Sequence, residues 1–78
     1  MLNDHRVIEA LEEADIDYDK EGYNQEKSFK DNGIDSLDVM SLFLVIEEKY
    51  GVRFSEKEAG LINTPIGISL ALDEKIKN

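Results

Sequence analysis

The chain has 78 residues, and its 18 Asp and Glu against 9 Lys and Arg give a formal net charge of −9. This charge disfavours nucleic acid and anionic membrane surfaces as partners, and it favours proteins with basic patches. The length predicts a single small domain, residues 1–78, and the absence of cysteine excludes a disulfide framework, a zinc finger and a cysteine nucleophile. We expect a cytoplasmic protein that does not insert into membranes, because the sequence shows neither a long apolar run nor a signal peptide.

The first helix is predicted over residues 3–14, with Asn3 as its N-cap. His5, the only histidine, falls in the first turn, where we expect an ordinary surface side chain because a catalytic histidine needs an oriented partner. The apolar residues recur at helical spacing and predict one buried face: Val7, Ile8, Leu11 and Ala14.

A long connection, residues 15–35, separates the first two helices. Loops of this length are uncommon in small domains and usually have a purpose. A short helical turn is expected at residues 27–31. Four apolar side chains are the expected anchors to the core: Tyr18, Tyr23, Phe29 and Ile34.

Acidic residues of this connection match part of a calcium-loop template. The matching positions are the first, third, fifth and twelfth: Asp15, Asp17, Asp19 and Glu26. However, Lys20 occupies the position where the turn needs glycine, and Gly22 comes two residues late. The pattern therefore favours a solvated acidic loop with at most weak affinity for divalent ions, and no metal site is predicted.

The second helix is predicted over residues 36–50 and ends at Gly51, a left-handed cap. This helix has more apolar residues than one buried face can accommodate. One face suits the core: Val39, Leu42, Phe43, Ile46 and Tyr50. A second ridge faces away from the core: Leu37, Met40 and Leu44. The ridge predicts a partner or ligand surface, with packing beneath the preceding loop as the alternative.

Two further helix starts follow. Ser55 and Glu58 form a capping box that opens a short third helix, which reaches residue 61 or 62. Thr64 as cap and Pro65 at the first helical position open the last helix, and Gly67 allows another element to approach closely. Together the patterns predict an all-α, four-helix bundle with three longer helices and one short third helix.

Ser36 stands at the start of the second helix, after a glycine-containing loop. Three roles are open to it: a helix cap, a hydrolase nucleophile, or a site of covalent cofactor attachment. The nucleophile is disfavoured because the G-x-S-x-G motif is missing and His5 is the only histidine, so no catalytic residue is predicted. A phosphate on the serine oxygen would lie at the positive end of the helix dipole.

The motif Asp35-Ser36-Leu37-Asp38 has Gly33-Ile34 before it, and the apolar helix after it ends in Glu47-Glu48-Lys49-Tyr50. This arrangement resembles acyl carrier proteins over nearly the whole chain. The resemblance implies a non-catalytic carrier in which Ser36 bears 4′-phosphopantetheine, whose thiol holds an acyl chain as a thioester. It also implies loading from coenzyme A by a magnesium-dependent phosphopantetheinyl transferase, with Asp35 helping to place the metal and phosphates.

The resemblance further implies a monomer whose second helix is recognised by acyltransferases, synthases or ligases with basic docking patches. The residues of this partner face are Leu37, Asp38, Met40, Ser41, Leu44, Glu47 and Glu48. An acyl chain folded back between the helices would be lined by Phe43, Ile46, Phe54, Ile62 and Leu72. For this last set a plain packed core is the alternative.

Three positions depart from carriers of bulk fatty-acid synthesis: Ser41 replaces a glutamate, Arg53 an acidic residue and Ser55 a proline. A dedicated acyl or secondary-metabolite pathway is therefore expected as readily as fatty-acid biosynthesis. Two alternatives stay open. One is a peptidyl or aminoacyl carrier, whose typical Gly-Gly-His/Asp-Ser-Leu differs from the Asn-Gly-Ile-Asp-Ser-Leu found here. The other is a small acidic interaction domain without a prosthetic group.

Overall fold

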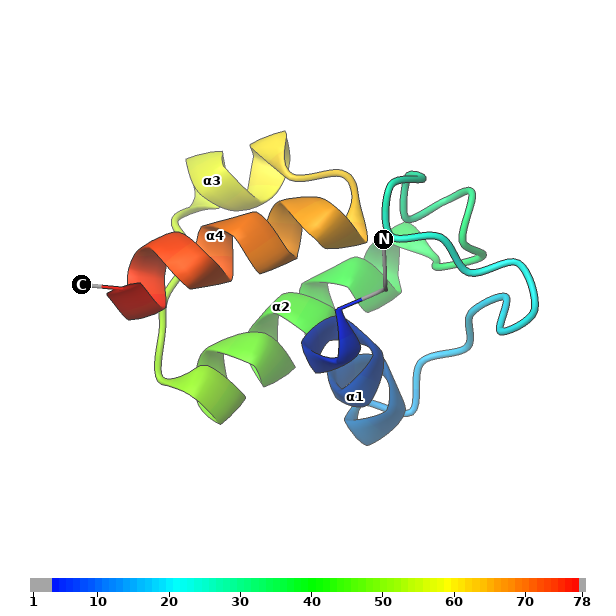
Figure 1. Cartoon of the computed structure of the whole chain (residues 1–78), viewed down its shortest axis with the longest axis horizontal. Coiled ribbons are helices and arrows are strands. Elements are labelled where there is room, and N and C mark those ends of the chain that lie inside the picture. Colours follow the sequence, from blue (N-terminus) through cyan, green and yellow to red (C-terminus); the bar gives the residue numbers. More distant parts are fainter. Residues whose placement is uncertain (1–3, 78) are drawn as a thin grey trace.

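The computed structural model describes residues 4–77, and this part of the chain forms four α-helices and no strand. The helices are α1 (His5–Glu13), α2 (Ser36–Tyr50), α3 (Glu56–Leu61) and α4 (Pro65–Lys77) (Figure 1). The predicted all-α fold, with three longer helices and a short third one, is confirmed.

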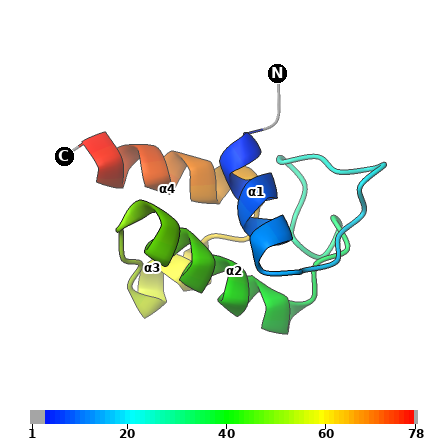
Figure 2. The same cartoon turned by 90° about the horizontal axis from the view of Figure 1, so that it is seen from below.

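The helices are arranged around α2 and α4, which run in the same direction, away from the long loop (Figures 1 and 2). α1 crosses both and contacts both. In the view of Figure 1, α3 lies above α4, and α1 lies beneath the first half of α2. The start of α2 therefore lies at the end of the molecule that the long loop covers.

Side chains supplied by the sequence begin the last three helices. The Asp35 carboxylate accepts a hydrogen bond from the second N–H of α2 at 3.0 Å. The Ser55 hydroxyl accepts from the Glu58 N–H at 3.1 Å, and the Glu58 carboxylate accepts from the Ser55 N–H at 3.0 Å, which is the predicted capping box. At α4, Thr64 Oγ1 accepts from the Gly67 N–H at 3.1 Å.

The N-cap of α1 lies one residue later than predicted. Asp4, with extended φ and ψ of −74° and 115°, is the N-cap, and α1 begins at His5. Asp4 takes this role because its carboxylate reaches both the backbone N–H of Arg6, at 2.9 Å, and the Arg6 guanidinium. Asn3, the predicted cap, lies outside the described residues.

Two glycines act as predicted. Gly51 ends α2 in the left-handed conformation with φ 66°, where residues with a Cβ are strained. Gly67 lies against the link between α3 and α4. A Cβ at this position would lie 3.0 Å from Cγ2 of Ile62, so a larger residue would require the Ile62 side chain to shift by a few tenths of an ångström.

The core lies where α1, α2 and α4 meet, and the loop closes it. Of the four predicted anchors, Phe29 and Ile34 are buried, while Tyr18 and Tyr23 pack at the edge with ring centroids 5.6 Å apart. Ile16, which the sequence pattern did not single out, is also buried. The remaining buried apolar residues are Val7, Ala10, Leu11, Leu42, Phe43, Ile46, Ile68 and Leu72.

The loop turns around one buried amide. The expected helical turn at residues 27–31 is instead a hydrogen-bonded turn one residue further on, in which the Asn32 N–H donates to the Ser28 carbonyl at 3.1 Å. Asn32 is fully buried, and its Nδ2 donates to the carbonyls of Asn24, Lys27 and Ser28. Because a buried amide needs such partners, this residue fixes the path of the loop toward Ser36.

Hydrogen bonds also tie the loop to the helix ends. The Phe29 N–H donates to the Asn63 carbonyl at 3.0 Å, and the Ile66 N–H donates to the Gln25 carbonyl at 2.9 Å. The Gln25 side chain accepts from the Asp4 N–H at 2.8 Å. The loop is therefore held against the starts of α1 and α4 before it enters α2.

Candidate functional site

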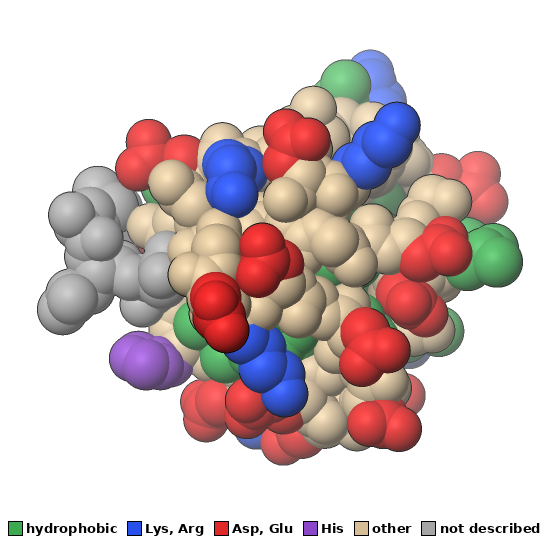
Figure 3. Space-filling view, turned by 90° about the vertical axis from the view of Figure 1, so that its right-hand side faces the viewer, with side chains coloured by type: hydrophobic (Ala, Val, Ile, Leu, Met, Phe, Trp, Pro, Cys, Tyr) green, Lys and Arg blue, Asp and Glu red, His purple; other side chains and the backbone are tan. Residues whose placement is uncertain are grey.

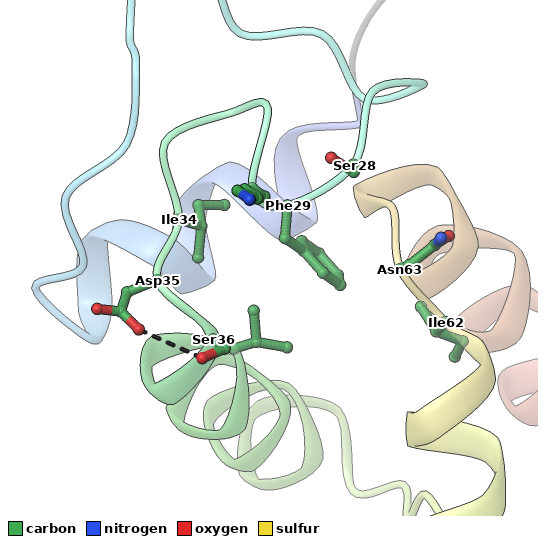
Figure 4. A pocket seen from close by; sticks show the side chains of 9 residues that line it. Ser28, Phe29, Ile34, Asp35, Ser36, Ile62 and Asn63 are labelled. Carbon is green, nitrogen blue, oxygen red and sulfur yellow. Dashed lines mark hydrogen bonds between the residues drawn. The ribbon is translucent and has the colours of Figure 1, made fainter.

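Ser36 is the first residue of α2, and it is exposed. It does not cap the helix, because the Asp35 carboxylate accepts the hydrogen bond from the Leu37 N–H. The Ser36 hydroxyl donates only a long hydrogen bond, 3.5 Å, to Asp35 Oδ1 (Figure 4). The structure therefore contradicts the interpretation of Ser36 as a cap and leaves its hydroxyl accessible.

A hollow of about 600 Å³ opens beside this hydroxyl. Three segments form it: the end of the long loop, the first turn of α2 and the link between α3 and α4 (Figure 4). Its apolar wall consists of Phe29, Ile34, Val39 and Ile62. Its polar part consists of Ser28, Lys30, Asp35, Ser36 and Asn63. Because the segments are far apart in sequence, no local pattern pointed to the hollow, and Ser28, Lys30 and Asn63 were not predicted as site residues.

The hollow contains one cation, Lys30, and one anion, Asp35. Neither belongs to an ion pair within the described part of the chain. The ion pairs found there join other segments: Arg6 with Asp4 and Asp73, Lys49 with Glu13, and Lys75 with Glu58. Among the described residues, no ion pair therefore neutralises either charged residue of the hollow's lining.

The predicted second ridge of α2 is exposed. Leu37, Met40 and Leu44 have exposed fractions of 75%, 69% and 58%, which contradicts packing beneath the loop. Leu61 of α3, at 76%, is a further exposed apolar side chain that sequence reasoning missed. The polar residues of the predicted partner face are exposed or partly exposed: Asp38, Ser41, Glu47 and Glu48. Of these, Glu47 also accepts from the Phe54 N–H at 2.7 Å and so holds the linker after α2.

The implied acyl-chain residues are divided between two places. Ile62 lines the hollow beside Ser36. Phe43, Ile46 and Leu72 are buried in the core, and Phe54 packs edge to face on Phe43 with ring centroids 5.0 Å apart. The hollow and this set share only Ile62, and a role for the set in holding an acyl chain stays a prediction.

The acidic residues of the loop do not converge. Asp15, Asp17, Asp19 and Glu26 are exposed, and Figure 3 shows carboxylates spread over the loop side of the molecule. Among the described residues, no group of three or more His, Cys, Asp or Glu side chains is placed to hold a metal ion. Asp19 instead accepts a hydrogen bond from the Gly22 N–H at 3.0 Å, which stabilises a turn.

Comparison with known proteins agrees with this geometry. A family model described as the phosphopantetheine attachment site matches residues 5–65, which include the whole of α1, α2 and α3. The anthracycline acyl carrier protein DauA of Streptomyces sp. (strain C5) is 36% identical over 50 residues, a stretch that covers 64% of this chain and 60% of the relative. The chain belongs to the phosphopantetheine-bearing acyl carrier family.

Family membership defines a carrier rather than a catalyst, and its cofactor is 4′-phosphopantetheine. It overturns the alternative of an acidic interaction domain without a prosthetic group. No helix in the described residues combines the length and apolar character needed to cross a membrane.

The start of α2 fits the chemistry of this group. The positive end of the α2 dipole favours a phosphate on the Ser36 oxygen, and Lys30 is a cationic residue in the lining of the adjoining hollow. The apolar wall suits the methyl groups that the cofactor carries near its phosphate. When bound, the cofactor supplies a terminal thiol, a group that this cysteine-free chain does not itself contain.

Proposed function

We propose that Ser36 bears the phosphopantetheine arm and that the protein presents acyl intermediates, held as thioesters, to partner enzymes. The observation that carries this proposal is a serine that is exposed, begins a helix and does not cap it. Within the described residues this hydroxyl makes one long hydrogen bond, to Asp35, and the surrounding segment matches the phosphopantetheine attachment site.

Loading replaces one bond of Ser36 with another. The Oγ–H bond breaks and an Oγ–P bond forms, while the bond between this phosphorus and the 3′,5′-ADP part of coenzyme A breaks. The ADP part leaves with the electron pair, and the proton passes to a base of the transferase. Among the described residues Ser36 has Asp35 as its one hydrogen-bond partner, at 3.5 Å, and no base that would make it a nucleophile on its own. A second enzyme is therefore part of the proposal.

Asp35 has two roles in this proposal. Its carboxylate caps α2, and its negative charge beside the hydroxyl suits a magnesium ion held by the transferase, since carboxylate oxygens are typical ligands of that ion. The Asp35 carboxylate belongs to the residue directly before Ser36, whose oxygen accepts the phosphate, and this position supports a role for Asp35 beside the magnesium ion.

Partner recognition is assigned to the ridge and its flanking carboxylates. The exposed side chains of Leu37, Met40 and Leu44 supply contact area, and Asp38 and Glu48 meet basic residues of the partner. Small charged interfaces associate quickly and release quickly. That behaviour suits a carrier that visits several enzymes in turn.

We favour a dedicated pathway over bulk fatty-acid synthesis. The similar protein from Streptomyces is named as an anthracycline acyl carrier, and similarity to an acyl carrier favours an acyl load over an aminoacyl or peptidyl one. Ser41 and Arg53 are exposed, so their departures from the fatty-acid pattern alter the surface that a partner meets.

The test is the intact mass of the purified chain after incubation with coenzyme A, magnesium and a broad-specificity phosphopantetheinyl transferase. We expect the wild type and Ser55→Ala to gain one phosphopantetheinyl group and Ser36→Ala to gain none. Ser55 is the control because it is an exposed serine outside α2 and outside the predicted partner face. A folded wild type that gains no mass with a competent transferase would overturn the proposal.

A further inference from the structure

The hollow beside Ser36 has a feature that attachment alone does not require. It adjoins the hydroxyl and combines an apolar wall with a cation, Lys30, that forms no ion pair within the described residues. We propose that the hollow seats the phosphate end of the arm, with Lys30 as the counter-ion of the phosphodiester and Ile62 in contact with the dimethyl-substituted carbon that follows. This inference rests on the proposed attachment at Ser36.

The charge change on loading supports Lys30 in this role. Before loading, the Ser36 hydroxyl donates to the Asp35 carboxylate. Loading removes that proton, so the hydrogen bond is lost and an anionic diester stands beside an anionic carboxylate. Two close anions repel each other unless a cation compensates, and the chain already has a formal net charge of −9. Lys30 is the one cation among the residues that line the hollow.

The order of groups along the arm identifies which part would occupy the hollow. The phosphate comes first, the dimethyl-substituted carbon follows within a few bonds, and the thiol with its acyl cargo lies at the far end. Ser36 itself lines the hollow, so the first groups meet the wall made by Ile34, Val39 and Ile62. The cargo remains free to reach a partner enzyme.

Contacts within the chain hold the wall opposite Ser36 in place (Figure 4). Asn63 accepts a hydrogen bond from the Phe29 N–H at 3.0 Å, which joins the link between α3 and α4 to the long loop. Ile62 packs against Gly67, where an added Cβ would approach its Cγ2 to 3.0 Å. A preformed wall needs no ordering when the arm enters, which favours seating.

The experiment compares the unloaded and loaded chain by amide and phosphorus NMR. On loading we expect the amide signals of Ile62 and Asn63 to shift, as well as those at the start of α2. We also expect the phosphorus signal of the loaded wild type to move with salt, because screening weakens the pair with Lys30. In loaded Lys30→Gln the signal stays at its high-salt position. Lys27→Gln is the matched control, because Lys27 belongs to the same loop but does not line the hollow.

Amide shifts confined to residues 35–39 would overturn the inference, as would a phosphorus signal in Lys30→Gln that responds to salt as the wild type does. The mass of each sample is measured first, so the two proposals fail separately. A wild type without a mass gain contradicts attachment, whereas a loaded chain without shifts at Ile62 and Asn63 contradicts only the seat. Lys30 is exposed, so its substitution leaves the core intact.

Discussion

The helices α1 and α2 each begin after an aspartate N-cap, but the two caps differ in their ion pairs. Each follows an aspartate in extended conformation whose carboxylate accepts a backbone hydrogen bond: Asp4 from the Arg6 N–H at 2.9 Å, and Asp35 from the Leu37 N–H at 3.0 Å. At α1 the Arg6 guanidinium also pairs with Asp4 and, at 2.9 Å, with Asp73 of α4. At α2 the Asp35 carboxylate forms no ion pair with the described residues.

The difference separates a helix start that an ion pair joins to another helix from one without an ion pair among the described residues. Hydrogen bonding to the Arg6 side chain holds the pKa of Asp4 at about 2, and the pair joins two helices. Ser36, directly after the second cap, is exposed and lies beside an open hollow. The same capping chemistry thus fixes the fold at one helix start and, at the other, presents a hydroxyl that the fold does not use.

The largest expected effect is that of Ser36→Ala, which abolishes loading and changes the free energy of unfolding by less than about 0.5 kcal/mol, as for an exposed side chain without structural contacts. Urea denaturation and intact mass measure the two quantities. Ser55→Ala is the control, because Ser55 does cap a helix and its loss costs about 1 kcal/mol. Equal destabilisation by the two variants would show that Ser36 is structural.

The Asp4→Ala variant is expected to lose about 2 kcal/mol of stability at neutral pH, because it removes both a cap and a partly buried ion pair. Asp35→Ala, which removes a cap alone, is expected to lose about 1 kcal/mol. Both values come from urea denaturation. A larger loss of stability in Asp35→Ala than in Asp4→Ala would contradict the proposed difference between the two helix starts.

The dependence of stability on pH tests the role of Asp4 without any substitution in α2. The pKa of Asp4 is lowered from 3.8 to about 2 in the folded chain. Its contribution is therefore fully present above pH 3.8 and is lost as the pH falls through this range toward 2. In Asp4→Asn we expect a flatter dependence of stability on pH in that interval. If stability depended on pH as steeply in Asp4→Asn as in the wild type, Asp4 would not contribute to acid unfolding.

A smaller effect should separate the two roles of Asp35. An asparagine oxygen still caps α2, so Asp35→Asn should change stability by only a few tenths of a kcal/mol. Its loading rate with the transferase should nevertheless fall, because the charge that suits the magnesium ion is gone. Unfolding curves and the time course of mass gain measure this. If Asp35→Asn were loaded as fast as the wild type, Asp35 would act only as a helix cap.

The smallest change in stability is expected on the ridge. Met40→Ala should alter the free energy of unfolding by less than about 0.5 kcal/mol, because the side chain is 69% exposed. Leu42→Ala, two residues away and fully buried, should lose about 3 kcal/mol. A large loss from Met40→Ala would mean that the ridge belongs to the fold rather than to a partner surface.

Local signals explain which parts of this fold could be predicted. The capping box at Ser55, the left-handed Gly51 and the exposed ridge each depend on neighbours within one helical turn. The start of α1 could not be fixed in this way. Asn3 and Asp4 are both capping residues, and the choice depends on Arg6 and on Asp73, which lies 67 residues from it.

The hollow was beyond sequence reasoning because distant segments build it. Lys30 and Asn63 share no sequence pattern, yet they line the same hollow, and the buried amide of Asn32 helps to set the path of the loop that carries Lys30. An apolar pattern likewise cannot separate a core residue such as Leu72 from a lining residue such as Ile62. The sequence predicted Ser36 as the attachment residue, through its position at a helix start and the chain's resemblance to carriers, and this assignment stays a prediction.

The most direct test of the central claim is fragmentation of the loaded chain by tandem mass spectrometry, which assigns the added group to one residue. Attachment at Ser36 predicts that the phosphopantetheinyl group is found on Ser36 alone. Its presence on Ser28, Ser41 or Ser55 would contradict the view that the exposed, non-capping hydroxyl at the start of α2 is the site that the carrier uses.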